Sequence, residues 1–269
     1  MRNKQKIPLW KCSWLLGLLV VVAWLTGASA AEKRELLVSA AISLKEPLQE
    51  IGARFEHDHS DVKVAFNLGA SGVLQQQIEQ GAPVDVFVSA ASKQMDELES
   101  KGLILSATRH TLAVNVVVLA APATSPSHLL TFKDLTKPEV KLIAIGNPRT
   151  VPAGQYAQAI LTSLGLWDIL QPKLLLAANV RQTLTYVARG EVDAGLVYAT
   201  DAQSAGRAVR VVAVAPEGSA PPIRYPIAVV KASQQPTLAG AFVNVALGEV
   251  GQQILKAHGF LPSSKTVAR

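Results

Sequence analysis

Short apolar segments alternate with amphipathic segments from residue 35 to residue 101, and this alternation constrains the fold more than any other feature of the sequence. Runs of strand length are followed by runs with a helical period, and glycines end two of the helical runs. The predicted strands are 35–40, 62–67 and 84–89, and the predicted helices begin at residues 43, 73 and 92. Successive strand–helix units favour an α/β fold in which a mostly parallel sheet carries helices on its faces.

The first of these helices has a well-defined apolar face and a polar start. The apolar face consists of Leu44, Leu48, Ile51 and Phe55. Ser43 stands three residues before Glu46, which is the spacing of a capping box. We therefore expect the Ser43 side chain to cap the helix.

The alternation continues through the rest of the chain. Strands are predicted at 114–119, 141–145, 174–177, 194–198, 209–213 and 225–230, and helices at 156–164, 180–189 and over most of 237–258. We predict two lobes, with lobe two (114–225) inserted into lobe one (31–113 plus 226–269). Ligands of open α/β sheets bind at the carboxyl ends of the strands, so the cleft between the lobes is the predicted ligand site.

Residues 1–30 have the organisation of a secretory signal peptide. Basic residues come first, an apolar run spans 14–25, and Ala28-Ser29-Ala30 forms a small-residue cleavage site. We predict cleavage after Ala30 and a periplasmic mature protein. An uncleaved membrane anchor is the alternative, which the shortness of the apolar run disfavours. Cys12 precedes the apolar run, whereas an acylated cysteine would follow it, so a lipoprotein is not expected.

The composition of the chain without this leader excludes several functions. The leader holds four of the 26 Lys and Arg residues, which leaves 22 against 20 Asp and Glu residues and a net charge of +2. That balance gives no support to nucleic-acid binding, which needs a basic face. The single Cys also lies in the leader, so thiolate chemistry is not expected of the mature chain. The histidines show no metal-ligand spacing: they are His57, His59, His110, His128 and His258.

Several predicted helices begin with small or polar residues directly after a strand. These starts are Ile42-Ser43, Ala70-Ser71-Gly72, Val151-Pro152-Ala153-Gly154 and Asn179-Val180-Arg181. In the third start, Pro152 suits the first helical position and its small neighbours leave the N–H groups of the first turn uncovered and unpaired. Such a start favours an anion. Each start alone is explained by helix capping, and Tyr198 at a strand end is alone explained as a core aromatic.

These segments resemble the periplasmic molybdate-binding proteins of ABC transporters. The resemblance rests on Ala40–Leu44, Gly69–Gly72, Gln77–Ala90, Val151–Ala157, Asn179–Arg181 and Gly195–Ala202, and it covers nearly the whole mature chain in order. It implies a two-lobed type II periplasmic-binding-protein fold, with a mixed, mostly parallel sheet flanked by helices in each lobe. It also implies that neutral groups in the cleft between the lobes hold a tetrahedral oxyanion.

The same resemblance implies a set of ligand contacts. They are the hydroxyl groups of Ser43, Ser71 and Tyr198 and the backbone N–H groups of Ala153 and Val180. These groups would contact the oxygen atoms of molybdate or tungstate and not the metal atom. The resemblance further implies a monomer that has no cofactor, catalyses no reaction and delivers its ligand to a membrane ABC permease. Ile42, Gly69 and Gly72 depart from the family pattern, so additional contacts from flanking side chains stay open.

A site made of donors suits a fully ionised anion. Molybdate, tungstate and sulfate accept hydrogen bonds and donate none, whereas hydrogen phosphate carries a proton that needs an acceptor. None of the implied contacts is Asp or Glu, so phosphate should be rejected. Arg149 and Arg181 adjoin two of the helix starts. We interpret both as solvated surface residues, with steering of the anion as the alternative.

Other functions stay open at this stage. A sulfate or thiosulfate receptor would share the fold and the donors. A secreted hydrolase could use Ser43 or Ser71 as a nucleophile, but it needs a His or Lys base, and Lys45 is the one such residue close to these motifs. The sensor domain of a transcriptional regulator is the remaining alternative. The leader and the lack of a basic recognition helix argue against it.

Overall fold

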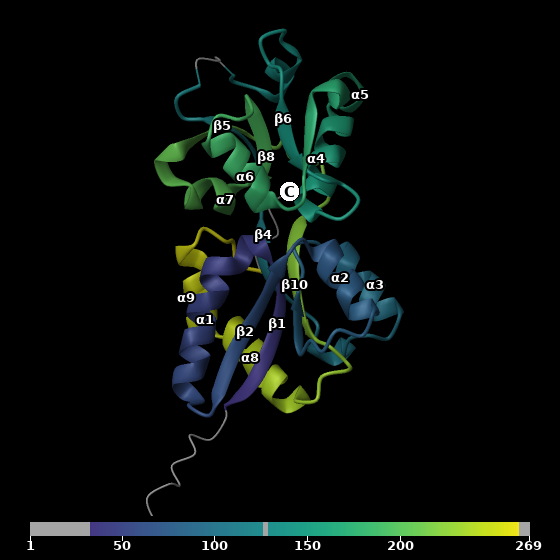
Figure 1. Cartoon of the computed structure of the whole chain (residues 1–269), viewed down its shortest axis with the longest axis vertical. Coiled ribbons are helices and arrows are strands. Elements are labelled where there is room, and N and C mark those ends of the chain that lie inside the picture. The colour runs from purple at the N-terminus through teal and green to yellow at the C-terminus, as the bar shows by residue number, and fades with distance from the viewer. Residues whose placement is uncertain (1–32, 126–128, 264–269) are drawn as a thin grey trace, which may run out of the picture. The chain divides into compact units, whose positions relative to one another are not determined.

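Two mixed sheets organise the chain (Figure 1). The computed structural model describes residues 33–125 and 129–263, and the predicted leader lies outside these ranges. Within them, the first sheet has the strand order β2-β1-β3-β10-β4 and the second has the order β7-β6-β8-β5-β9. The predicted α/β class, with a mixed sheet on each side of the proposed cleft, is confirmed.

The first sheet combines parallel and antiparallel pairs. Its strands are β1 (Arg34–Ala41), β2 (Val62–Gly69), β3 (Val86–Val88), β4 (His110–Asn115) and β10 (Ile223–Val229). β1 pairs in parallel with β2 and β3, whereas β10 is antiparallel to β3 and β4. The parallel strands therefore end together, and the loops that follow β1 and β2 lie at one edge of the sheet.

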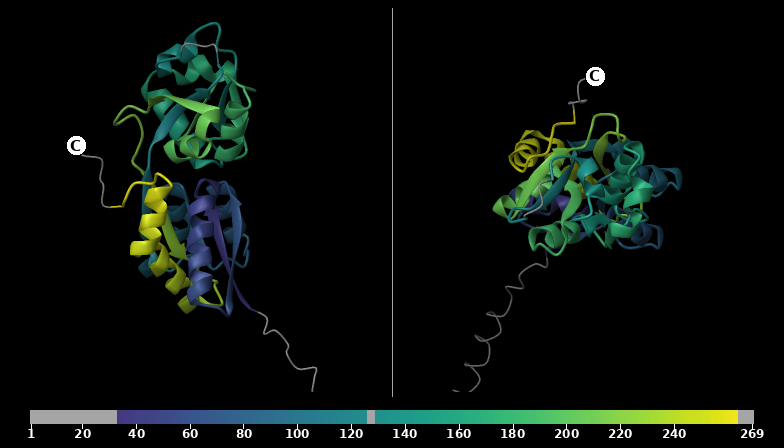
Figure 2. Two further views of the ribbon diagram at one scale, coloured as in Figure 1. Left: turned by 90° about the vertical axis from the view of Figure 1, so that its left-hand side faces the viewer. Right: turned by 90° about the horizontal axis from the view of Figure 1, so that it is seen from above.

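Helices cover both faces of the first sheet. α1 (Lys45–Asp58), α8 (Pro236–Leu247) and α9 (Glu249–Ala257) belong to one apolar cluster, and α2 (Ser71–Glu79) and α3 (Ser92–Ser100) belong to another. Side chains of a strand alternate between the faces, and accordingly Val86 and Val88 join the first cluster while Phe87 joins the second. Figure 2 shows α8 and α9, in yellow, beside α1.

The predicted helix after β1 is present, but the capping box is wrong. Leu48, Ile51 and Phe55 are fully buried on the inner face of α1, as the periodicity predicts. A 3-10 turn over Ile42–Leu44 precedes the helix, and no side-chain hydrogen bond caps it. The Ser43 hydroxyl lies instead 3.2 Å from the Tyr225 hydroxyl, because the turn directs the side chain into the interior.

The second sheet has a similar arrangement. Its strands are β5 (Val117–Pro122), β6 (Ile143–Gly146), β7 (Leu174–Ala177), β8 (Ala194–Tyr198) and β9 (Val209–Val214). β6 is parallel to β7 and β8, and β5 is antiparallel to β8 and β9. The accompanying helices are α4 (Pro152–Ser163), α5 (Trp167–Leu170), α6 (Val180–Ala188) and α7 (Ala199–Ser204). α4 and α6 both contact β6 and β8, so their first turns lie at the carboxyl ends of these strands.

The chain passes between the sheets at two places. Val116 alone separates β4 from β5, and residues 215–222 join β9 to β10. The predicted single strand over 114–119 is therefore wrong, because its residues divide between strands of different sheets. A continuous apolar run contains no signal for such a division. No helix in the described ranges is long and apolar enough to cross a membrane.

Candidate functional site

A small pocket lies where the strands of both sheets end. Its volume is about 10 Å³, which is the room of roughly one water-sized sphere. All five ligand contacts implied by the family resemblance line it. The full lining is Ala41, Ile42, Ser43, Gly69, Ala70, Ser71, Ala90, Val151, Pro152, Ala153, Val180 and Tyr198. The predicted residues, which come from distant parts of the sequence, are thus brought together around a space that suits a small ligand.

The two serines enter the pocket from the first sheet. Ser43 follows β1 and is 3% exposed, and Ser71 is the first residue of α2 and is fully buried. The backbone N–H of Ala90 donates to the Ser71 hydroxyl oxygen at 3.0 Å. This bond uses one lone pair of the oxygen, and the Ser71 hydrogen can donate into the pocket.

Two backbone N–H groups enter from the second sheet. Ala153 is the second residue of α4 and Val180 is the first residue of α6, so neither N–H has a partner within its helix. Neither N–H donates a hydrogen bond within the described part of the chain. The sequence led us to expect that all N–H groups in the first turn of α4 are unpaired. This is wrong for Gly154, whose N–H donates to the Val151 carbonyl oxygen.

Glycine is required at the start of α4. A Cβ atom on Gly154 would stand 1.9 Å from the carbonyl oxygen of Gly146 at the end of β6. Any other residue would force the start of the helix or the end of the strand to shift, next to the Ala153 N–H. At the start of α6, the Asn179 side chain caps the helix by accepting a hydrogen bond from Gln182 N–H. This bond leaves the Val180 N–H uncovered.

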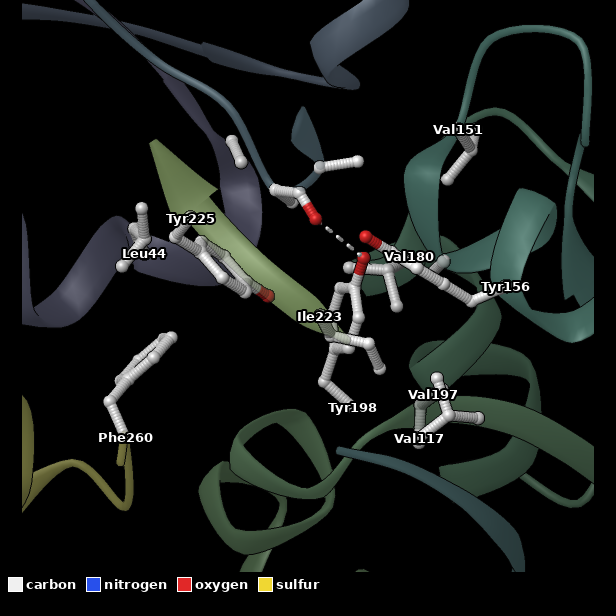
Figure 3. Close-up of a cluster of buried hydrophobic side chains, with 14 of the residues drawn as sticks. Leu44, Val117, Val151, Tyr156, Val180, Val197, Tyr198, Ile223, Tyr225 and Phe260 are labelled. Atoms are coloured by element: carbon white, nitrogen blue, oxygen red, sulfur yellow. Dashed lines mark hydrogen bonds between the residues drawn. The ribbon is translucent and has the colours of Figure 1, made fainter. Parts of the chain in front are cut away.

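Tyr198 ends β8 with its hydroxyl inside the site. The hydroxyl donates to the Ala90 carbonyl oxygen at 3.4 Å, a bond that connects the two sheets (Figure 3). Burial raises the pKa of Tyr198 well above its ordinary value, so the hydroxyl keeps its proton. Its single hydrogen has to leave the Ala90 carbonyl oxygen in order to donate to a ligand in the pocket. Its ring meets that of Tyr225 edge to face at 5.6 Å, which fixes its direction.

Charged side chains are absent from the residues described as lining the pocket. Arg149 is exposed, as expected. Arg181 is not the solvated residue we expected, because its side chain is 24% exposed and its guanidinium pairs with Glu46 of α1 and lies 3.1 Å from Asp201 of α7. The lining includes no His or Lys that could serve as a base for Ser43 or Ser71, and Lys45 is exposed. The hydrolase alternative has no support in this geometry.

Sequence reasoning missed the residues that support the donors. These are Tyr225, whose hydroxyl contacts that of Ser43, Asn115, which donates to the Tyr225 hydroxyl, and the backbone of Ala90, which donates to Ser71. It also missed the contact of Gly72 N–H with the Thr150 carbonyl oxygen at 3.0 Å, which joins the starts of the helices α2 and α4. No local pattern marks these residues, because their roles arise from segments that meet in the folded chain. No cluster of metal-ligating side chains occurs in the described ranges.

Comparisons with known proteins agree with this geometry. A family model described as bacterial extracellular solute-binding protein matches residues 36–261. Over 238 residues the chain is 39% identical to the molybdate-binding protein ModA of Escherichia coli (strain K12), with 87% of this chain and 91% of the relative covered.

Solved structures show the same relationship. The periplasmic molybdate-binding protein of Azotobacter vinelandii superposes with a TM-score of 0.74 at 28% identity, over 84% of this chain and 98% of that chain. The sulfate-binding protein SubI of Mycobacterium tuberculosis H37Rv gives a TM-score of 0.73 at 19% identity, over 87% and 89% of the two chains. The second likeness extends to the fold alone.

Proposed function

Because this chain belongs to the family of bacterial extracellular solute-binding proteins, we propose that it captures molybdate outside the cytoplasm and delivers it to an ABC permease. Proteins of this family bind solutes, are not enzymes and carry no cofactor. The observation that carries the proposal is the ring of neutral hydrogen-bond donors around one small pocket. Relatives named for molybdate binding, in sequence and in structure, support the choice of anion.

The donors match the chemistry of a tetrahedral dianion. Ser43, Ser71 and Tyr198 offer hydroxyl groups, and Ala153 and Val180 offer N–H groups at the positive ends of helices. Hydrogen bonds to a charged acceptor are stronger than neutral ones, so such a set can replace the hydration of the anion. A site without a cationic side chain leaves no unpaired buried charge when the anion departs, which favours release to a permease.

The pocket would distinguish the candidate anions by whether they carry a proton. Hydrogen phosphate would direct its proton at a donor, since the lining includes no carboxylate. Tungstate has the charge and shape of molybdate, so we propose that it binds as well. Sulfate is the second candidate, because it offers the same acceptors and a sulfate-binding protein has this fold.

Capture requires the two lobes to move together. We propose that lobe one comprises 31–113 and 226–269 and that lobe two comprises 114–225, so both boundaries lie within the crossing strands β4 and β10. Donors from both sheets line one pocket, so an anion there would stabilise the approach of the lobes. Val116 and residues 215–222 are the segments about which such a motion would occur.

The remaining parts of the proposal concern location and assembly. The leader directs export, cleavage follows Ala30, and the mature protein acts in the periplasm as a monomer. It presents the anion to a membrane permease and binds no nucleic acid.

Titration calorimetry of the mature protein tests the proposed function. Molybdate, tungstate, sulfate and phosphate are titrated in turn, and the fluorescence of Trp167, which begins α5 beside α4, is followed in parallel. We expect heat and a fluorescence change with molybdate and tungstate, and neither with phosphate. A response to sulfate equal to that to molybdate would overturn the assignment of the anion.

A further inference from the structure

We propose that Asn115 and Tyr225 are positioning residues that fix Ser43 as a hydrogen-bond donor toward the pocket, through a relay with one direction. The relay would make the site selective for oxyanions without a proton. This inference rests on the proposed function and concerns how the same site discriminates among anions. Neither residue lines the pocket, so both would act through Ser43.

The direction of the relay is set at Asn115. This side chain is 4% exposed, and the backbone N–H of Val116 donates to its Oδ1 atom at 2.9 Å. A backbone N–H bonds to an acceptor, so the amide oxygen faces Val116 and the amide nitrogen faces the other way. The nitrogen then donates to Thr200 Oγ1 at 2.9 Å and to the Tyr225 hydroxyl oxygen at 3.3 Å.

Tyr225 passes this direction to Ser43. Its hydroxyl oxygen accepts from the Asn115 amide nitrogen, which has no lone pair to offer, so the tyrosine hydrogen must turn elsewhere. Ser43 Oγ lies 3.2 Å away in a contact that allows either hydroxyl to be the donor, and in the proposed relay Tyr225 donates. Ser43 then uses one of its two lone pairs to accept this bond, and its own hydrogen is free for the pocket. Burial raises the pKa of Tyr225 well above its ordinary value, so the donor proton is retained.

The surroundings hold the tyrosine in this role. Tyr225 is fully buried, and its ring packs edge to face against Tyr198 at 5.6 Å and against Phe260 at 5.4 Å (Figure 3). An aromatic ring held on two sides keeps its hydroxyl oxygen in place, while the O–H bond still rotates toward an acceptor. Asn115 is equally fixed, since it ends β4 immediately before the chain crosses to β5.

Ser71 also accepts a hydrogen bond from a neighbouring group, but its donor is a backbone N–H. The Ala90 N–H occupies its oxygen, as the Tyr225 hydroxyl occupies that of Ser43. In this arrangement the hydrogen of each serine is available to the anion before it arrives. Hydrogen phosphate would need a hydroxyl oxygen to accept its proton, and each serine oxygen already has one of its two lone pairs engaged. Selectivity thus depends on neighbours of the serines as well as on the serines themselves.

Two variants test the relay by different chemistry. Asn115→Asp keeps the shape but replaces the donor by an acceptor, so Tyr225 should donate to the new carboxylate and Ser43 should turn its lone pair to the pocket. Tyr225→Phe removes the middle of the relay without adding charge and leaves Ser43 free to accept or donate. Tyr186→Phe is the matched control, because its hydroxyl accepts from Gln182 on α6 away from the pocket.

The measurement is calorimetric affinity for molybdate and for inorganic phosphate at a mildly alkaline pH. We expect Asn115→Asp to lower the ratio of molybdate to phosphate affinity by about tenfold or more, and Tyr225→Phe to lower it by less. The added charge of Asp weakens the binding of both dianions alike. A change in the ratio of the two affinities therefore reports the direction of the relay. Tyr186→Phe should keep the wild-type ratio.

The outcomes separate this inference from the proposed function. A wild-type protein that binds molybdate, with an unchanged ratio in both variants, would overturn the relay. A wild-type protein that does not bind molybdate would instead overturn the proposed function. Thermal unfolding establishes that each variant is folded, and if Asn115→Asp does not fold, the ratio for Tyr225→Phe decides.

Discussion

Ser71 shows how a hydroxyl group receives its role from its neighbours. Its oxygen accepts from Ala90 N–H, so its hydrogen is the group that an anion would meet. We expect Ser71→Ala to weaken molybdate binding by about tenfold or more, because one oxygen of the buried anion loses its donor. Ser100→Ala on α3, where the exposed hydroxyl bonds to the carbonyl oxygen of Glu97, should leave the affinity unchanged. Equal calorimetric dissociation constants for wild type and Ser71→Ala would contradict the assignment of this donor.

The sequence predicted which residues line the site but not the residues that orient them. The bare helix starts, with the family resemblance, pointed to the residues that line the pocket. Their role as ligand contacts stays a proposal. The partners that orient them, such as Tyr225 and the Ala90 backbone, could not be predicted because they are distant in sequence from Ser43 and Ser71. The direction of a hydroxyl group depends on such partners and not on the residues beside it in the sequence.

At the scale of elements, the starts of α2 and α4 touch across the site. Gly72 N–H donates to the Thr150 carbonyl oxygen, and a Cβ atom on Gly72 would lie 2.6 Å from that oxygen. We expect Gly72→Ala to weaken molybdate binding by about tenfold while the protein stays folded, since alanine is a better helix residue than glycine. Affinity is measured by calorimetry and stability by urea unfolding.

Gly240→Ala provides the matched comparison for this variant. Gly240 lies inside α8, and a Cβ atom there meets no neighbour within 4 Å. The substitution should raise the free energy of unfolding by about 0.5–1 kcal/mol and leave affinity unchanged. If Gly72→Ala bound molybdate as tightly as Gly240→Ala, the contact between the two helix starts would not contribute to binding.

Strands and helices were predicted best where the apolar run in the sequence had clear ends. The strands 174–177 and 194–198 have the predicted bounds, because each is an apolar run followed closely by a helix. α5, α7 and the 3-10 turns were missed, since short elements carry too little periodicity. The capping box failed because tertiary contacts redirected Ser43. The type II periplasmic-binding-protein fold, which the family resemblance implied, is confirmed by the two mixed sheets and by the likeness to solved structures.

At the scale of the whole molecule, a cluster of ionisable side chains connects helices that pack on different sheets. Arg181 of α6 pairs with Glu46 of α1 and lies beside Asp201 of α7, which is fully buried. Burial raises the pKa of Asp201 to about 7, and the neighbouring Arg181 opposes this shift. The unfolded chain should titrate near its ordinary value of about 3.9.

This shift predicts how stability depends on pH. Between about pH 4 and pH 7 the folded state binds a proton at Asp201 that the unfolded state has released. The contribution of this group to the free energy of unfolding therefore falls as the pH rises, by at most about 1.4 kcal/mol per pH unit. Asp201→Asn should flatten that slope in urea unfolding measured across the window. The same slope in wild type and variant would show that Asp201 does not titrate there.

The central claim is that neutral donors from both sheets surround one oxyanion. A crystal structure of the mature protein with molybdate, with the metal located by its anomalous scattering, tests this claim most directly. We predict the metal at the centre of the pocket, with its oxygen atoms within hydrogen-bonding distance of Ser43, Ser71, Ala153 N–H, Val180 N–H and Tyr198. Molybdate bound elsewhere, or held by Arg181 or another cationic side chain, would contradict it.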